Sequence, residues 1–179
     1  MGCASAILRL LTCIALALFG MAPHTARAGL AGPPEEIAPG VFLLYSQFGS
    51  WKSGNIWGGF TPTTVIEMKD GREFGWRLRV RTEKDSVKLK VVLTLPAPPK
   101  IWAHQGEIIE GNASRDGTMT ISADRRTSTT ESEHPVVDGW VLDGWSSAEG
   151  DPVGDHVVRI YANEKLVRVF RFQVVAPKK

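Results

Sequence analysis

Few residues of this chain have the types and spacing that metal binding or nucleophilic catalysis requires. After the N-terminal segment the histidines are His104, His134 and His156. Asp151 and Asp155 lie near His156, but no second histidine or cysteine accompanies them, so the set is weak for zinc. The carboxylates lack the Asp-x-Asp-x-Asp-Gly spacing of calcium loops, and there is no Gly-x-Ser-x-Gly elbow. We therefore expect no metal, no cofactor and no catalytic residue.

His156 has two interpretations. It begins a predicted strand and shares a face with Val158 and Ile160, so it can be a half-buried, neutral side chain that keeps one ring nitrogen for a backbone partner. The alternative is a metal ligand or a general base beside a carboxylate. A small hydrolase that uses His104 or His156 in this way is the least favoured of three functions, and we expect a protein that is not an enzyme.

The segment 51–60 places large aromatic side chains among glycines that cannot cover them. Trp51, Trp57 and Phe60 could therefore stack on sugar rings or on apolar peptide side chains. Trp102 or Trp145 could extend such a surface. The alternative interpretation is that Trp51 and Trp57 are core anchors of a strand.

A cationic patch is the second candidate for ligand contact. Residues 74–81 and 87–95 alternate apolar and polar side chains, which predicts two strands that each bury one face. The short polar turn between them predicts a hairpin. The face opposite the apolar one then gathers five cations, namely Arg77, Arg79, Arg81, Lys88 and Lys90. This patch could attract an anionic partner, or it could be a solvated sheet face partly neutralised by nearby glutamates.

Residues 1–28 have the pattern of a secretory signal peptide. Arg9 precedes an apolar run over 10–19, and a small-x-small end closes at Ala28, which predicts cleavage before Gly29. The run is about half of the ~20 residues that cross a bilayer. We expect a periplasmic or secreted protein with no membrane span after cleavage and, because both cysteines leave with the signal, no disulfide.

The charge balance argues against a polyanionic partner for the whole molecule. The chain has 21 Lys+Arg and 19 Asp+Glu, and two arginines leave with the signal, so the formal charge of the mature protein is zero. No global field for nucleic acid or a membrane surface follows. The length fits one domain over 40–179, preceded by a proline-rich extended leader over 29–39.

Alternating apolar and polar residues indicate an all-β chain. The pattern predicts strands at 41–45, 65–68, 74–81, 87–95, 118–122, 140–142, 155–161 and 166–175. The last two pair across Asn163 and Glu164, and a change of face within the final strand predicts a β-bulge near Arg168. About seven strands separated by turn signals favour an immunoglobulin-like antiparallel β-sandwich, with a small closed barrel as the alternative.

Several segments of the chain resemble a family of exported bacterial proteins built on an Ig-like domain of unknown function. The segments that carry the resemblance are 71–80, 91–98, 140–142, 152–161, 165–167 and 170–174. The resemblance covers about residues 40–175 and implies a fold, but it supplies no catalytic residues.

These observations predict an exported, non-catalytic Ig-like binding module. Its expected partner is an envelope or secreted protein, contacted through sheet edges or loops. The alternative is a glycan-binding module that uses exposed tryptophans.

Overall fold

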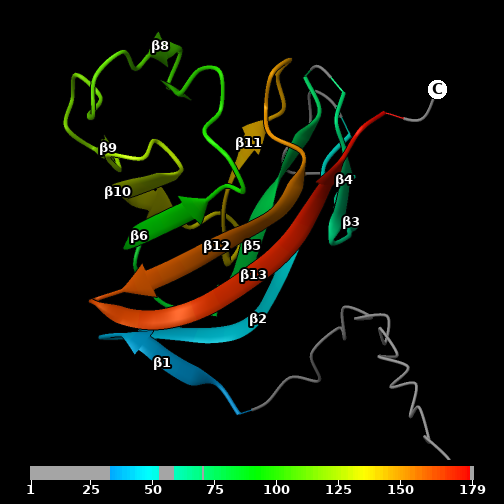
Figure 1. Ribbon diagram of the computed structural model, residues 1–179. Coiled ribbons are helices and arrows are strands. Elements are labelled where there is room, and N and C mark those ends of the chain that lie inside the picture. The colour runs from blue at the N-terminus through cyan, green and yellow to red at the C-terminus, as the bar shows by residue number, and fades with distance from the viewer. Residues whose placement is uncertain (1–32, 53–58, 70, 178–179) are drawn as a thin grey trace, which may run out of the picture.

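A computed structural model describes residues 33–52, 59–69 and 71–177. The predicted signal peptide, its cleavage point and Trp57 lie outside these residues. The described chain is all-β, and two sheets face each other (Figure 1). Among the described residues, no helix is long and apolar enough to cross a membrane.

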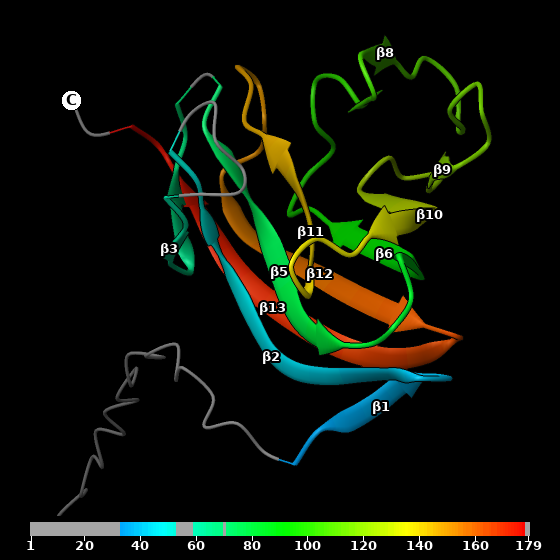
Figure 2. The same ribbon diagram turned by 180° about the vertical axis from the view of Figure 1, so that it is seen from behind.

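The first sheet has the strand order β1-β2-β5-β11, with β3 paired to the end of β2. These strands are β1 (Glu35–Ala38), β2 (Val41–Ser50), β3 (Thr61–Pro62), β5 (Glu73–Arg81) and β11 (Trp140–Ser146). All the pairings within it are antiparallel. Strand β11 therefore forms one edge of this sheet, and Figure 2 shows it beside β5.

The second sheet has the order β4-β13-β12-β6-β10-β9. Its strands are β4 (Val65–Glu67), β6 (Ser86–Thr94), β9 (Met119–Ile121), β10 (Thr127–Pro135), β12 (Gly154–Ala162) and β13 (Lys165–Val175). Strand β4 runs parallel to β13. The long connection from β6 to β10 projects from one side of the sandwich and carries β7 (Ala103–His104) and β8 (Glu107–Ile108) (Figure 1).

The core lies between the two sheets and is built by the predicted alternation. Trp76 and Leu78 of β5 are fully buried, as are Val158 and Ile160 of β12. Within the described chain, seven strands have seven or more residues, and these are β2, β5, β6, β10, β11, β12 and β13. The prediction of an all-β, Ig-like antiparallel sandwich is confirmed.

The predicted hairpin between residues 74–81 and 87–95 is wrong. Strand β5 pairs with β2 and β11, whereas β6 pairs with β10 and β12, so the turn after Arg81 carries the chain from one sheet to the other. The predicted burial of the apolar face of each strand is nevertheless correct. Two strands of one sheet turn their apolar faces toward the same core, and two strands in facing sheets turn them toward each other, so both arrangements bury the same residues. Alternation alone does not distinguish these arrangements.

The C-terminal hairpin matches its prediction closely. Strands β12 and β13 pair antiparallel, and Asn163 and Glu164 turn the chain with positive φ angles of 50° and 63°, as a tight hairpin turn requires. The register shifts between Ile160 and Tyr161, which face Arg168 and Leu166. The extra residue is Val167, so the predicted bulge near Arg168 is confirmed.

Five of the described strands were not predicted: the two-residue strands β3, β7 and β8, and the longer strands β1 and β10. Strand β1 lies within the expected leader over 29–39, pairs with β2 and buries Ile37 to 2% exposure. The sandwich therefore includes residues from Glu35 onward rather than from Gly40. Strand β10 lies in the polar segment 100–136, where the only predicted strand was 118–122, and it joins β6 along its whole length.

Candidate functional site

A cleft of about 640 Å³ opens at the edge of the sandwich where β10 and β11 face each other. Residues 102–106 of the long connection form a further wall. We call this hollow the edge cleft. Its volume lies in the range of pockets that hold small ligands.

The inner face of β10 lines the edge cleft with polar side chains. They are Ser128, Thr130, Ser132 and His134. The residues that they face on β6 are all apolar and buried, namely Leu93, Val91, Leu89 and Val87. Ser128 and His134 are only 3% and 6% exposed. Neighbouring strands of one sheet thus present opposite chemistry to the interior, and the polar row lies where a sandwich usually places apolar residues.

His134 is the most enclosed titratable group of this row. Its Nε2 atom lies 3.2 Å from Ser132 Oγ, and its ring centroid lies 5.6 Å from that of Trp76. Burial lowers the pKa of His134, while nearby Asp143 and a hydrogen bond with the Leu142 backbone act in the opposite direction. The Trp76 indole N–H has no hydrogen-bond partner among the described residues.

Asp143 faces His134 from β11. It alternates with Val141 and Trp145 on the face of β11 that covers the core, and its Oδ1 accepts a hydrogen bond of 2.8 Å from the Gly144 N–H. Burial raises the pKa of Asp143, and His134 opposes this shift. Burial therefore favours the uncharged forms of both side chains.

Ser132, His134 and Asp143 have the residue types of a hydrolytic triad, but among the described residues no hydrogen bond joins His134 to Asp143, whose Oδ1 accepts from the Gly144 N–H instead. In a triad the carboxylate stays ionised and stabilises the imidazolium. Burial instead raises the pKa of Asp143, and the His134 ring is hydrogen-bonded to the Leu142 backbone. The arrangement can donate and accept hydrogen bonds to an uncharged molecule.

The outer part of the edge cleft is aromatic. Trp102 and Trp145 both line it, and both also line an adjoining apolar hollow of about 350 Å³. Trp102 is fixed by an indole N–H donated to the Arg125 carbonyl at 2.9 Å, and Trp145 packs against Phe74 with ring centroids 6.0 Å apart. The two tryptophans therefore separate a polar cleft from an apolar one.

His104 reaches the edge cleft from the long connection. Its Nε2 atom lies 3.0 Å from Thr118 Oγ1, which in turn donates to Asp116. Hydrogen bonds from Ser114 and Thr118 lower the pKa of Asp116 to about 2. Within the described chain, no three histidine, cysteine or acidic side chains converge as metal ligands.

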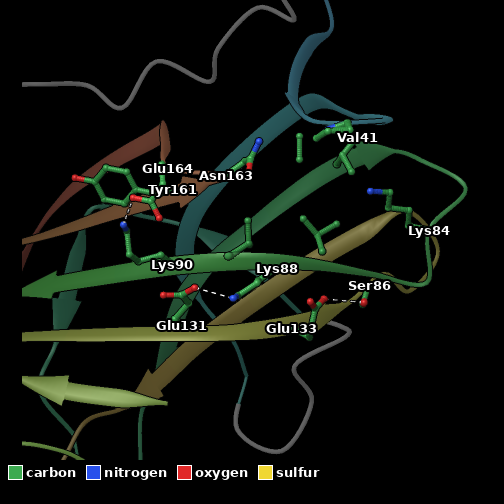
Figure 3. Close-up of a pocket in the computed structure, with 14 residues that line it drawn as sticks. Val41, Lys84, Ser86, Lys88, Lys90, Glu131, Glu133, Tyr161, Asn163 and Glu164 are labelled. Atoms are coloured by element: carbon green, nitrogen blue, oxygen red, sulfur yellow. Dashed lines mark hydrogen bonds and ion pairs between the residues drawn. The ribbon is translucent and has the colours of Figure 1, made fainter. Parts of the chain in front are cut away.

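A second cleft, of about 510 Å³, contains two of the predicted cations, Lys88 and Lys90, together with Lys84 (Figure 3). We call it the lysine cleft. Lys88 Nζ lies 2.8 Å from Glu131 Oε1, and Lys90 Nζ lies 2.6 Å from Glu164 Oε2. The hydrogen bonds to these glutamates raise the pKa of each lysine. Glutamates therefore neutralise this surface locally.

The predicted arginines lie on the other sheet, so the five cations do not form one patch. Arg77 donates two hydrogen bonds to Gln47 Oε1, and its guanidinium lies 4.1 Å from the Phe60 ring centroid. Burial lowers the pKa of Arg77. Arg79 donates to the Asp138 carbonyl, and Arg81 lies over Phe42. The separation follows from the chain crossing between sheets after β5.

The described aromatics of segment 51–60 pack against the first sheet. Trp51 is 4% exposed and meets Phe60 edge-to-face at 5.0 Å. This placement matches the interpretation of Trp51 as a core anchor. Phe60 is half-buried between Trp51 and Arg77.

His156 is placed as the structural interpretation requires. It is 4% exposed, its Nδ1 atom lies 3.0 Å from the Gly154 carbonyl oxygen, and its ring stacks on Phe172. Burial lowers the pKa of His156, which favours the neutral ring.

The sequence analysis missed Ser132 and Asp143, and it left His134 without a role. A usable signal was present in the hydroxyl and imidazole side chains at every second position from 128 to 134. This is the period of a strand, carried by polar rather than apolar residues. Asp143 stands between two apolar residues of the same face, Val141 and Trp145.

The fold and the edge cleft define an Ig-like β-sandwich whose open edge holds a polar cleft. The family model described as the PM0630 beta sandwich domain matches residues 47–175, which is more than half of the chain. The chain belongs to this family, whose domain has no known function, and the resemblance found in the sequence is confirmed.

Comparison with curated proteins found no match. Among solved structures, the chain is similar to an immunoglobulin-like protein from Pseudomonas aeruginosa, with 18% identity and a TM-score of 0.43. The similarity covers 73% of this chain and 91% of that one.

Proposed function

We propose that this protein is an exported, non-catalytic binding module and that the edge cleft holds its ligand. The observation that carries the proposal is the polar inner face of β10, where Ser128, Thr130, Ser132 and His134 line a cavity of about 640 Å³. Buried polar groups cost stability unless they are hydrogen-bonded, so a row of them at core-facing positions is a mark of function.

Export rests on the N-terminal sequence. The apolar run over 10–19 and the end at Ala28 are the support for a periplasmic or secreted location. Mass spectrometry of the exported protein should give an N-terminus at Gly29. An intact Met1, or a lipid attached to Cys13, in the mature pool would contradict it.

Contact with a protein partner through the edge of β11 has less support than a ligand in the cleft. Alternate residues of an edge strand point their backbone groups outward, where a partner strand could pair with them. At Gly144 the N–H is already bonded to Asp143 Oδ1, and the Leu142 backbone is bonded to His134. Both groups are thus satisfied within the chain.

The cleft can be tested by mapping amide chemical shifts while the protein is mixed with the low-molecular-mass fraction of an envelope extract. We expect changes clustered on β10 and β11 and no chemical conversion of the bound component. Changes confined to the lysine cleft, or the absence of any change, would contradict the assignment of the site. Turnover of the bound component would contradict the non-catalytic role.

A further inference from the structure

We infer that the edge cleft binds an uncharged saccharide, with the hydroxyls of Ser128, Thr130 and Ser132 as its hydrogen-bonding partners. The inference rests on the proposed function, since it names the ligand class of the same cleft. Four features of the cleft support it: its charge, its hydroxyl row, its aromatic walls and two outward backbone groups of β11 that are already bonded within the chain.

The charge of the cleft disfavours ionic ligands. No lysine or arginine is among the described residues that line it, so a phosphate, sulfate or carboxylate would find no cationic partner. Burial disfavours the charged forms of His134 and Asp143, so neither side chain is a ready ionic partner for a charged ligand. Glu133 also borders the cleft, but its carboxylate accepts a hydrogen bond of 2.8 Å from Ser86. An uncharged polar ligand is the complement of such a lining.

The hydroxyl row offers donors and acceptors in a fixed spacing. Every second residue of a strand is about 7 Å from the next on the same face. A serine or threonine hydroxyl can donate one hydrogen bond and accept two. Within the described chain, the side chains of Ser128 and Thr130 make no hydrogen bond, so both hydroxyls can turn toward a ligand. Sugar hydroxyls are themselves both donors and acceptors and match this row.

Trp102 and Trp145 add the apolar part of saccharide recognition. A sugar ring has C–H faces between its hydroxyls, and an aromatic ring with polar neighbours can cover such a face. Both tryptophans border the cleft together with the polar row, and both are held in place by contacts with the rest of the domain. A ligand in the cleft can therefore meet both hydroxyls and aromatic rings.

An extended peptide is the competing occupant, and the strand edge disfavours it. A peptide that added to β11 would need the outward N–H of Gly144 and the outward backbone of Leu142. The first is occupied by Asp143 and the second by His134. A saccharide needs neither group.

The test uses isothermal titration calorimetry on the full exported protein. The probes are cellotriose, chitotriose and maltotriose as uncharged saccharides, a heparin tetrasaccharide as an anionic one, and a Thr-Val hexapeptide as an extended peptide. We expect at least one uncharged trisaccharide to bind. Thr130→Val, which exchanges a hydroxyl for a methyl group, should weaken this binding tenfold or more. Thr129→Val changes the other face of the same strand and is the matched control, expected to bind as the wild type does.

Thermal unfolding of each variant establishes that it is folded, and Ser132→Ala replaces Thr130→Val if the latter is not. Saccharide binding that Thr130→Val leaves unchanged would overturn the assigned site. Binding of the peptide or the heparin fragment instead, weakened by Thr130→Val, would overturn the saccharide inference and leave the ligand-binding function standing. Absence of binding by every probe, together with no shift in the envelope-extract experiment, would overturn both.

Discussion

The two faces of β10 are both polar, yet the structure treats them differently. On the outer face, Glu131 and Glu133 are exposed and paired with Lys88 and Ser86 at 2.8 Å. On the inner face, Ser128 and His134 are buried, Thr130 and Ser132 are half-buried, and burial of His134 lowers its pKa, which favours the neutral ring. The outer groups satisfy one another within the protein, whereas the inner hydroxyls border a cavity. Polarity alone is thus a weak sign of binding. Ser132 and His134 of the inner face also contact each other, so the two faces differ in the hydroxyls of Ser128 and Thr130, which have no hydrogen bond within the described chain.

Truncation of Trp76, which packs against His134 of the inner face, should have the largest effect on the free energy of unfolding. Trp76 is fully buried beside His134. Trp76→Ala should lower the free energy of unfolding by about 3–5 kcal/mol, as truncation of a core aromatic does. Urea titration measures the loss. Trp140→Ala on the outside of β11 is the control and should cost less, because Trp140 is only half-buried. Equal losses would mean that the inner and outer faces of the first sheet are misassigned.

Of the two buried histidines, His156 is the one that we expect to have a structural role alone. His156 fills core volume against Phe172, so His156→Ala should lower the free energy of unfolding by about 2–4 kcal/mol through a cavity. His156→Phe should cost less than about 1.5 kcal/mol, because the volume is retained. Thermal and urea unfolding give both values. A rise of the melting temperature with zinc in the wild type, absent from His156→Phe, would instead make His156 a ligand.

The pH dependence of the free energy of unfolding should reveal the lowered pKa of His134. Burial lowers its folded-state pKa, so the unfolded chain takes up the proton first, and stability is lost as the pH falls below about 6.5. His134→Gln should show a smaller loss in acid than the wild type does. His156 shifts in the same direction and is present in both proteins, so the difference belongs to His134. Superimposable stability profiles would contradict a buried neutral His134.

The Asp143 carboxyl should make the free energy of unfolding fall as the pH rises, the opposite of the effect of His134. Its folded-state pKa is raised, so the stability that it contributes is present in acid and is lost as the pH rises through that pKa. Asp143→Asn should remove this alkaline-side loss. Stability measured from pH 4 to 8 tests it, and an unchanged slope in the variant would contradict the raised pKa of Asp143.

The smallest effects should come from the outer face. Lys88→Ala should leave the unfolding midpoint unchanged, because exposed ion pairs add little to stability.

The wild type should not be retained on phosphatidylglycerol vesicles. Glu131→Gln with Glu164→Gln frees two lysines and should create weak retention that falls as salt shortens the Debye length to about 8 Å. Strong retention of the wild type would show that the lysine cleft is not neutralised.

The sequence predicted the elements whose apolar residues alternate. Burial of Trp76, Leu78 and their neighbours followed from period-two patterning, and the bulge at Val167 followed from a break in it. Strand β10 was missed because its inner face is polar, so it carries no apolar alternation. The edge cleft was missed for the same reason, since its lining comes from that strand.

Sheet membership was the other part that the sequence did not reveal. Residues 74–81 and 87–95 have the pattern of two half-buried strands, and that pattern is the same whether they pair or face each other. The prediction of one cationic patch depended on the pairing of these two segments, and it is wrong because they lie in different sheets. Which strands pair is decided by contacts between distant segments, such as β5 with β11 and β6 with β10.

The order of the strands has a consequence for how the molecule can fold. The interior strands of the second sheet include β12 and β13, which are the last two in the chain, and β6 needs β12 beside it. In a polypeptide that emerges N-terminus first from a ribosome or a translocation pore, this sheet stays incomplete until residues 154–175 are free. Pairing between distant segments is slow in any case. The second sheet therefore cannot close before β12 and β13 are available to pair with each other and with β6.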